Sequence, residues 1–206
     1  MLTIKKLLEV IVEYNDLPKF QVERAISTIL TFYIEQILSD DGNELELISP
    51  EYPLRKENNQ STNVDYLLIN KTKESIVLVE FKTNYREKTK SVLSHQNVYE
   101  TIVEKIKGET ASFLIDDVRT IRKKSTEKDK YTYLLKKAER INGSVREAEI
   151  IYLVPRAIKS KINEAIKNKR QKELVSTRII AFDEICASND NNDVYNELIN
   201  ALRMLK

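Results

Sequence analysis

Two short runs of consecutive apolar residues in the second half of the chain restrict the fold most strongly. Residues 149–155 (EIIYLVP) and 177–182 (TRIIAF) are rich in β-branched side chains, and a basic segment with helical spacing, about 158–174, joins them. Continuous apolar runs of this length are typical of strands that are covered on both faces. The sequence therefore predicts a sheet with helices on both sides.

Two further runs, closer to the N-terminus, predict a β-hairpin. Residues 64–70 and 76–82 are rich in residues that favour strands, and the five residues between them are polar. If this turn is symmetric, Asn70 faces Ser75, so Asp65 faces Glu80 and position 63 faces position 82. Another strand is expected over 44–48, followed by a polar segment without regular structure over 55–62.

Apolar residues at three- and four-residue steps predict helices over 2–14, 19–38, 89–107 and 193–205, with more helix within 108–142. The order of elements predicts an α/β fold with a mixed β-sheet flanked by helices on both faces. A length of 206 residues suits one core, and no linker or internal repeat divides the chain. We therefore expect a single domain over 1–206, with a basic helical insertion at about 108–145.

The composition excludes several classes of protein. With Cys186 as the only cysteine and His95 as the only histidine, neither an internal disulfide nor a zinc site of the usual Cys/His type can form. Only 3 glycines are present and no Gly-rich phosphate loop, which excludes a P-loop nucleotide hydrolase. No apolar run reaches the roughly 20 residues of a membrane span, and the N-terminus does not resemble a signal peptide. A soluble, cytoplasmic protein without a membrane partner is expected.

Positive charge is concentrated in one part of the chain. Residues 1–60 hold 6 Lys and Arg against 11 Asp and Glu, whereas residues 117–172 hold 17 against 7. A long basic stretch favours a polyanion such as nucleic acid, although a solvated helix surface explains it equally well. The candidates for contacts to a phosphate backbone are Arg122, Lys123, Lys124, Lys136 and Lys137.

The predicted hairpin brings three charged side chains onto one face of the sheet. Asp65 and Glu80 lie opposite each other, and Lys82 lies two residues beyond Glu80 on the same face. Two facing carboxylates repel each other, and a divalent cation such as Mg²⁺, which prefers oxygen ligands, would relieve this repulsion. The alternative is an ordinary cluster of cross-strand salt bridges.

These residues resemble a known family. Val64-Asp65 followed by residues 77–83 (VLVEFKT) is similar to the motif pair of the PD-(D/E)XK nuclease superfamily. Gln96-Asn97-Val98-Tyr99 is similar to the Q-x-x-Y signature of its RecB-like branch. The sequence departs from the family pattern because no proline precedes Asp65. The resemblance implies a restriction-endonuclease-like core formed by about 20–105 and 148–185.

The resemblance also implies a function, namely metal-dependent hydrolysis of DNA with Mg²⁺ or Mn²⁺ as cofactor. RNA remains an alternative substrate, and a homodimer is compatible with this family. Further alternatives are a catalytically inactive nuclease fold that binds nucleic acid and a protein-interaction module. The resemblance assigns metal binding to Asp65, Glu80 and the Phe81 carbonyl, and water activation to Lys82. It assigns support of the site to Gln96 and Tyr99. The family also has a glutamate on a helix before the first strand, for which Glu23 is preferred over Glu35, and Glu51 is an additional acidic group.

Overall fold

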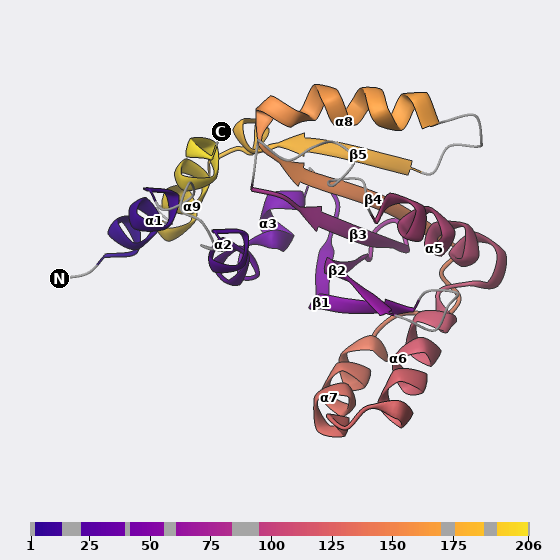
Figure 1. The fold of residues 1–206 in the computed structure, drawn as a ribbon. Helices are drawn as coiled ribbons and strands as arrows, with labels where there is room; N and C mark the ends of the chain where they lie inside the picture. Colours follow the sequence, from indigo (N-terminus) through magenta and orange to yellow (C-terminus); the bar gives the residue numbers. More distant parts are fainter. Residues whose placement is uncertain are drawn as a thin grey trace.

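The computed structural model of the chain describes residues 3–13, 22–39, 42–55, 61–83, 95–169, 176–187 and 193–205. Within these ranges the protein has an α/β fold with a five-stranded mixed sheet and eight α-helices (Figure 1). None of the helices in the described ranges is long and apolar enough to cross a membrane. The mixed α/β architecture expected from the order of elements is therefore confirmed.

The five strands lie in the sheet in the order in which they occur in the chain. The first three pair antiparallel, and the last three pair parallel, with β3 belonging to both groups. Helices connect the parallel strands, as a parallel pair requires. The strands are β1 Leu45–Arg55, β2 Ser61–Asn70, β3 Ser75–Phe81, β4 Glu147–Val154 and β5 Ser176–Ala181.

The hairpin of β2 and β3 has the register that the symmetric turn predicts. Asn70 pairs with Ser75, and the ladder continues to Tyr66 opposite Val79. The pairing ends there, one residue before Asp65 would meet Glu80. The strands therefore stop pairing at the point where the charged side chains begin, and this opens space between them.

Helices cover both faces of the sheet, and each face has its own apolar core. The hydrophobic residues of β2 to β4 alternate between the two cores because successive side chains of a strand point to opposite faces. One face carries α1 Ile4–Glu13, α2 Val22–Leu30, α3 Ile34–Leu38 and α9 Asp193–Met204. The other carries α5 Gln96–Glu109, α6 Ser112–Lys124, α7 Lys128–Ala138 and α8 Arg156–Lys169.

The prediction of one continuous helix over 19–38 is wrong, because a turn at residues 31–33 separates α2 from α3. The Thr31 hydroxyl donates a hydrogen bond to the Ser27 carbonyl at 2.9 Å. The amides of Phe32 and Tyr33 donate to the carbonyls three residues earlier in the chain. Hydroxyl bonds of this kind compete with the helical ladder, and three-residue bonds tighten the turn. Residues 14–21, on which the start of the predicted helix falls, lie outside the described ranges.

The predicted strand over 44–48 and the irregular segment over 55–62 are both wrong in extent. β1 continues to Arg55 despite Pro50 and Pro53, and β2 already begins at Ser61. β1 lies at the edge of the sheet, where a proline removes no required hydrogen bond. Of the helix predicted over 89–107, residues 95–107 are described and helical from Gln96, and the predicted segment 108–142 forms two helices.

The packing of α2 on the sheet is expected to depend on Leu30, which is fully buried in the core that α2 shares with β2 and β3. Replacement by alanine should lower the free energy of unfolding by about 2–5 kcal/mol because it removes buried methyl groups and leaves a cavity. Chemical denaturation followed by circular dichroism measures this loss. Leu7→Ala is the matched control: Leu7 is 39% exposed on α1, and a loss of less than about 1 kcal/mol is expected there.

Candidate functional site

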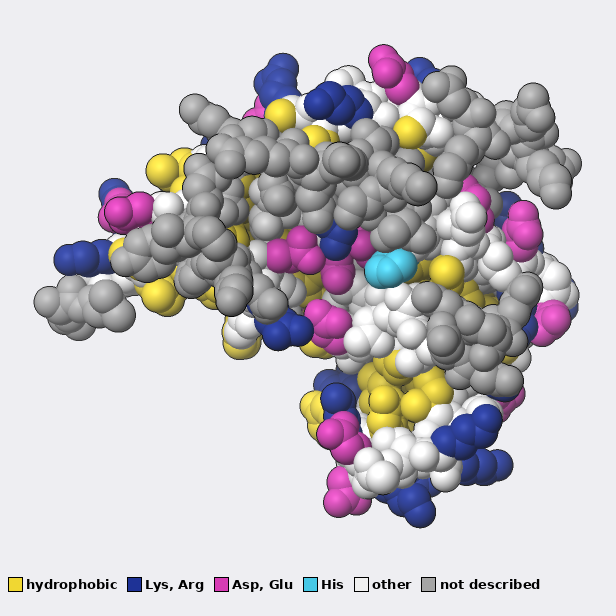
Figure 2. All heavy atoms as spheres, in the orientation of Figure 1, with side chains coloured by type: hydrophobic (Ala, Val, Ile, Leu, Met, Phe, Trp, Pro, Cys, Tyr) yellow, Lys and Arg dark blue, Asp and Glu magenta, His cyan; other side chains and the backbone are white. Residues whose placement is uncertain are grey.

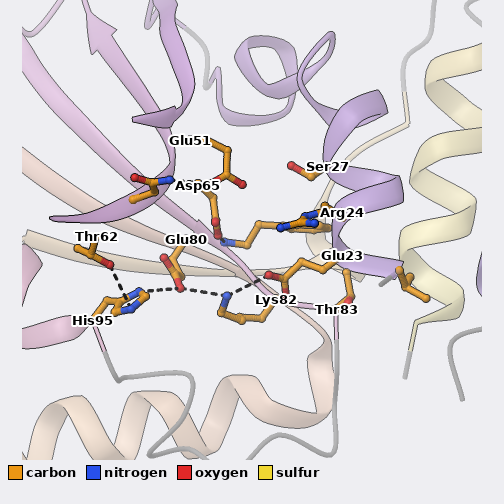
Figure 3. Close-up of a pocket in the computed structure, with 13 residues that line it drawn as sticks. Glu23, Arg24, Ser27, Glu51, Thr62, Asp65, Glu80, Lys82, Thr83 and His95 are labelled. Carbon is orange, nitrogen blue, oxygen red and sulfur yellow. Dashed lines mark hydrogen bonds and ion pairs between the residues drawn. The ribbon is translucent and has the colours of Figure 1, made fainter. Parts of the chain in front are cut away.

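A pocket of about 540 Å³ opens where β2 and β3 cease to pair, next to the first turns of α2. Figure 2 shows acidic and basic side chains and the histidine together near the middle of this face of the molecule. Figure 3 shows that these side chains come from β1, β2, β3 and the two residues after it, α2, and the residue just before α5. The described residues of the lining include four carboxylates, Glu23, Glu51, Asp65 and Glu80, and two cations, Arg24 and Lys82.

Asp65 lies at the position where β2 leaves its partner strand. Its Oδ2 accepts a hydrogen bond of 2.7 Å from the Phe81 amide, so the side chain replaces the backbone acceptor that β2 no longer supplies. Burial raises the pKa of Asp65 from 3.8 to about 7, and the charge of Glu80 adds to this shift. Asp65 therefore gives up its proton less readily than an exposed aspartate does.

Glu80 is 2% exposed, which is unusual for a carboxylate. Its Oε2 accepts a short hydrogen bond from the Tyr99 hydroxyl, while its Oε1 lies 3.1 Å from the Lys82 ammonium. Burial opposes ionisation, but contacts from His95, Lys82 and Tyr99 outweigh it and hold the pKa of Glu80 below its usual value. Glu80 is thus a buried anion whose charge the protein itself stabilises.

Lys82 is held between two glutamates. Its Nζ lies 3.1 Å from Glu80 Oε1 and 3.2 Å from Glu23 Oε1, and its side chain is only 15% exposed. Burial favours the neutral amine, but the charges of Glu80, Asp65 and Glu23 outweigh it and raise the pKa of Lys82 above its usual range. Lys82 is therefore positively charged at neutral pH, which suits it to orienting a water or stabilising negative charge.

Glu23 reaches this site because α2 is fixed to β2. The Tyr66 hydroxyl donates to the Ser27 carbonyl at 3.0 Å and lies 2.6 Å from the Ser27 hydroxyl. Ser27 is one helical turn after Glu23, so both side chains lie on the same face of α2. Glu35 instead accepts a hydrogen bond of 2.6 Å from the Leu47 amide, beside the register shift in β1. The structure thus places Glu23, the preferred glutamate, in the pocket, whereas Glu35 holds the backbone of β1.

Gln96 and Tyr99 lie next to the site but not in the pocket. Gln96 is 1% exposed and Tyr99 is fully buried, so neither side chain lines the pocket, and any support they give to the site comes from behind it. Gln96 accepts a short hydrogen bond from Tyr152 and donates one of 2.7 Å to Glu100. Both belong to the first turn of α5, whose inner face packs on β4, and their polar groups bond to other side chains of the protein.

His95 lines the pocket. It precedes the first residue of α5, and its Nε2 lies 3.3 Å from the Thr62 hydroxyl. Its Nδ1 is buried without a hydrogen-bond partner among the described residues, 3.7 Å from Glu80 Oε1. The signal in the sequence was the position of His95 immediately before the Q-x-x-Y segment.

Glu51 also lines the pocket, as the sequence allowed. It lies on β1 between the paired positions Pro50–Tyr66 and Tyr52–Val64, which places it opposite Asp65. The backbone of Glu51 has a φ of 49°, a conformation that is uncommon outside glycine and that concentrates at functional sites.

The five basic residues predicted to contact a phosphate backbone lie outside the pocket lining, in the last turns of α6 and α7. The Arg122 guanidinium donates to the Thr132 hydroxyl at 2.8 Å and thereby joins α6 to α7. The Lys137 ammonium lies 5.8 Å from the centre of the Tyr133 ring. Lys123, Lys124 and Lys136 are exposed. Basic groups at helix C-termini also stabilise the helix dipole, so their position does not require a nucleic acid.

The acidic groups of the pocket fit a small divalent cation. Asp65 and Glu80 repel each other, and the pocket contains more carboxylates than cations. Among the described residues no group of three or more His, Cys, Asp or Glu side chains is arranged to hold a metal ion. A cation would therefore rely on two carboxylates, backbone oxygen and water, which is the coordination that Mg²⁺ accepts.

Comparison of the chain with protein-family models, with curated proteins and with solved structures found no match. We therefore derive the function from the geometry of the pocket.

Proposed function

We propose that the protein is a metal-dependent nuclease that hydrolyses phosphodiester bonds of DNA and that its fold is a restriction-endonuclease-like core of the PD-(D/E)XK type. The observation that carries the proposal is the convergence of Asp65, Glu80 and Lys82 in one pocket at the end of a hairpin. A surface salt-bridge cluster does not require a glutamate that is 2% exposed or an aspartate whose pKa is raised to about 7. Perturbed carboxylates in a cleft are typical of functional sites.

Each residue of the cluster has a distinct role in the proposed reaction. Asp65 and Glu80, with the Phe81 carbonyl, would hold Mg²⁺ or Mn²⁺, which supplies Lewis-acid polarisation of the phosphate and activates a water molecule. Lys82 orients the attacking water and stabilises the charge that develops on the phosphate. Glu23 keeps the Lys82 ammonium in place through their contact of 3.2 Å.

DNA is the proposed substrate because the pocket combines this acidic centre with basic groups around it. Arg24 lines the pocket beside Glu23 and can contact a phosphate adjacent to the scissile one. The exposed lysines of α6 and α7, which lie outside the pocket, would contribute further contacts that do not depend on sequence. RNA shares the phosphodiester chemistry and is the alternative substrate.

A cleavage assay tests this proposal. The full chain is incubated with single-stranded DNA, double-stranded DNA and RNA of matched sequence, each with Mg²⁺, Mn²⁺ or EDTA. Cleavage of DNA that requires the metal is expected, because the metal would polarise the phosphate and activate the attacking water. Salt-dependent binding of DNA without cleavage under any of these conditions would contradict the proposal and favour a binding module.

A further inference from the structure

The two oxygens of the Glu80 carboxylate face different surroundings. Oε1 lies toward the pocket, 3.1 Å from the Lys82 ammonium and 3.7 Å from His95 Nδ1 (Figure 3). Oε2 is directed away from the pocket and accepts the short hydrogen bond of the Tyr99 hydroxyl. Because Tyr99 is fully buried and does not line the pocket, this bond ties Oε2 to the protein core.

Gln96, in the same helical turn as Tyr99, takes part in further hydrogen bonds next to Glu80. On the neighbouring strand β4, Tyr152 is paired with Glu80, and its hydroxyl donates to Gln96 Oε1. Gln96 in turn donates to Glu100. Gln96, Tyr99 and Tyr152 are each 1% exposed or less, so these polar groups are enclosed in the core behind Glu80, where hydrogen bonds are strong.

We infer that Tyr99 is a positioning residue that makes the cation site selective for small divalent ions, because its hydrogen bond holds Oε2 of Glu80 toward the core and leaves Oε1 as the oxygen that faces the pocket. This inference depends on the proposed metal site. Mg²⁺ takes six oxygen ligands at about 2.0–2.1 Å and binds carboxylates through one oxygen while it retains several waters. Ca²⁺ takes six to eight oxygens at about 2.3–2.6 Å and gains from a carboxylate that offers both of its oxygens.

The first test uses the unaltered protein. Isothermal titration of the full chain with MgCl₂ and, separately, with CaCl₂ at neutral pH gives the two dissociation constants. We expect Mg²⁺ to bind at least as tightly as Ca²⁺, because the second oxygen of Glu80 is withheld from the larger ion. Tighter binding of Ca²⁺ than of Mg²⁺ by the unaltered protein would overturn the inference.

The second test removes the hydroxyl. In Tyr99→Phe the ring is retained and Oε2 of Glu80 is released, so the ratio of Mg²⁺ to Ca²⁺ affinity should shift toward Ca²⁺ by about tenfold or more. Tyr52→Phe is the matched control, because Tyr52 is also fully buried and its hydroxyl donates to the Leu114 carbonyl at 2.9 Å, away from Glu80. This variant should lose stability but keep the affinity ratio of the unaltered protein.

An unchanged ratio in Tyr99→Phe, or the same shift in both variants, would show that Tyr99 has only a structural role. These results are distinguishable from a failure of the proposed function. If the ratio shifts as expected but no DNA is cleaved, the inference stands and the nuclease is excluded. If neither ion binds to the unaltered protein, both the inference about Tyr99 and the proposed metal-dependent nuclease are wrong.

Discussion

Replacement of Lys82 by alanine is expected to reduce metal-dependent cleavage of DNA by a factor of about 100 or more. The ammonium is the cation of the pocket that lies nearest to Glu80, at 3.1 Å, and its raised pKa keeps it charged. Removal of a group that orients the nucleophile or stabilises transition-state charge typically costs two to three orders of magnitude. Initial rates on a fluorescently labelled DNA, at saturating Mg²⁺, measure this loss.

Two controls separate chemistry from stability in this experiment. Lys73→Ala removes an exposed lysine from the turn at the opposite end of the same hairpin and should leave the rate unchanged. Lys82→Ala also leaves Glu80 buried without its cation, which costs stability, so its folding is checked by circular dichroism. Lys82→Arg retains the charge and should therefore be more stable than Lys82→Ala. Its larger guanidinium should still lower the cleavage rate below that of the unaltered protein. Equal rates for Lys82→Ala and the unaltered protein would exclude the proposed mechanism.

Replacement of Asp65 by asparagine is expected to have opposite effects on activity and on stability. Cleavage should be lost to the detection limit, because a proposed ligand of the cation is removed. The metal-free protein should nevertheless become more stable above neutral pH, by about 1–2 kcal/mol. This gain follows from the pKa of Asp65, which burial and the charge of Glu80 raise from 3.8 to about 7.

The direction of the pH dependence follows from this shift. A carboxyl whose pKa is higher in the folded state stabilises the fold fully below its unfolded pKa, and this contribution is lost as the pH rises through the folded value. The free energy of unfolding of Asp65→Asn, relative to the unaltered protein, should therefore increase between about pH 4 and pH 7 and then remain constant. Urea denaturation in EDTA at several pH values measures the difference.

Mg²⁺ provides an independent check on Asp65. The cation should raise the thermal midpoint of the unaltered protein and have little effect on Asp65→Asn, because an ion that binds only the folded state stabilises it. Asp116→Asn is the matched control, since Asp116 is exposed on α6 and pairs only with Arg119 at 2.8 Å among the ion pairs of the described ranges. A pH profile of Asp65→Asn that parallels that of the unaltered protein would contradict the assignment.

The sequence by itself determined the central hairpin and the class of fold. The length of the turn and the two-residue periodicity of the strands are local properties, and together they predicted the pairing of Asn70 with Ser75 that the structure has. The apolar run of β4 likewise predicted burial on both faces, because a strand that packs against helices on each side has no position for a solvated side chain. Asp65, Glu80 and Lys82 could thus be placed together before the structure was known.

Only the tertiary structure decided which other groups meet this cluster. The sequence offered both Glu23, the preferred candidate, and Glu35. The turn at residues 31–33 and the contact of Ser27 with Tyr66 place Glu23 beside Lys82. Glu51 lies in the pocket because β1 pairs with β2. The sequence predicted only an irregular segment, 55–62, between Glu51 and the strand that contains Asp65. Such contacts join residues far apart in the chain, so no local periodicity encodes them.

The orientation of the Q-x-x-Y segment was decided in the same way. Helical spacing places Gln96 and Tyr99 on one face of α5, but it does not show whether that face meets solvent or the sheet. The packing of α5 on β4 buried both residues and directed the Tyr99 hydroxyl to Glu80. Spacing along the chain therefore determined which side chains act together, and burial of apolar area between distant elements determined what they contact.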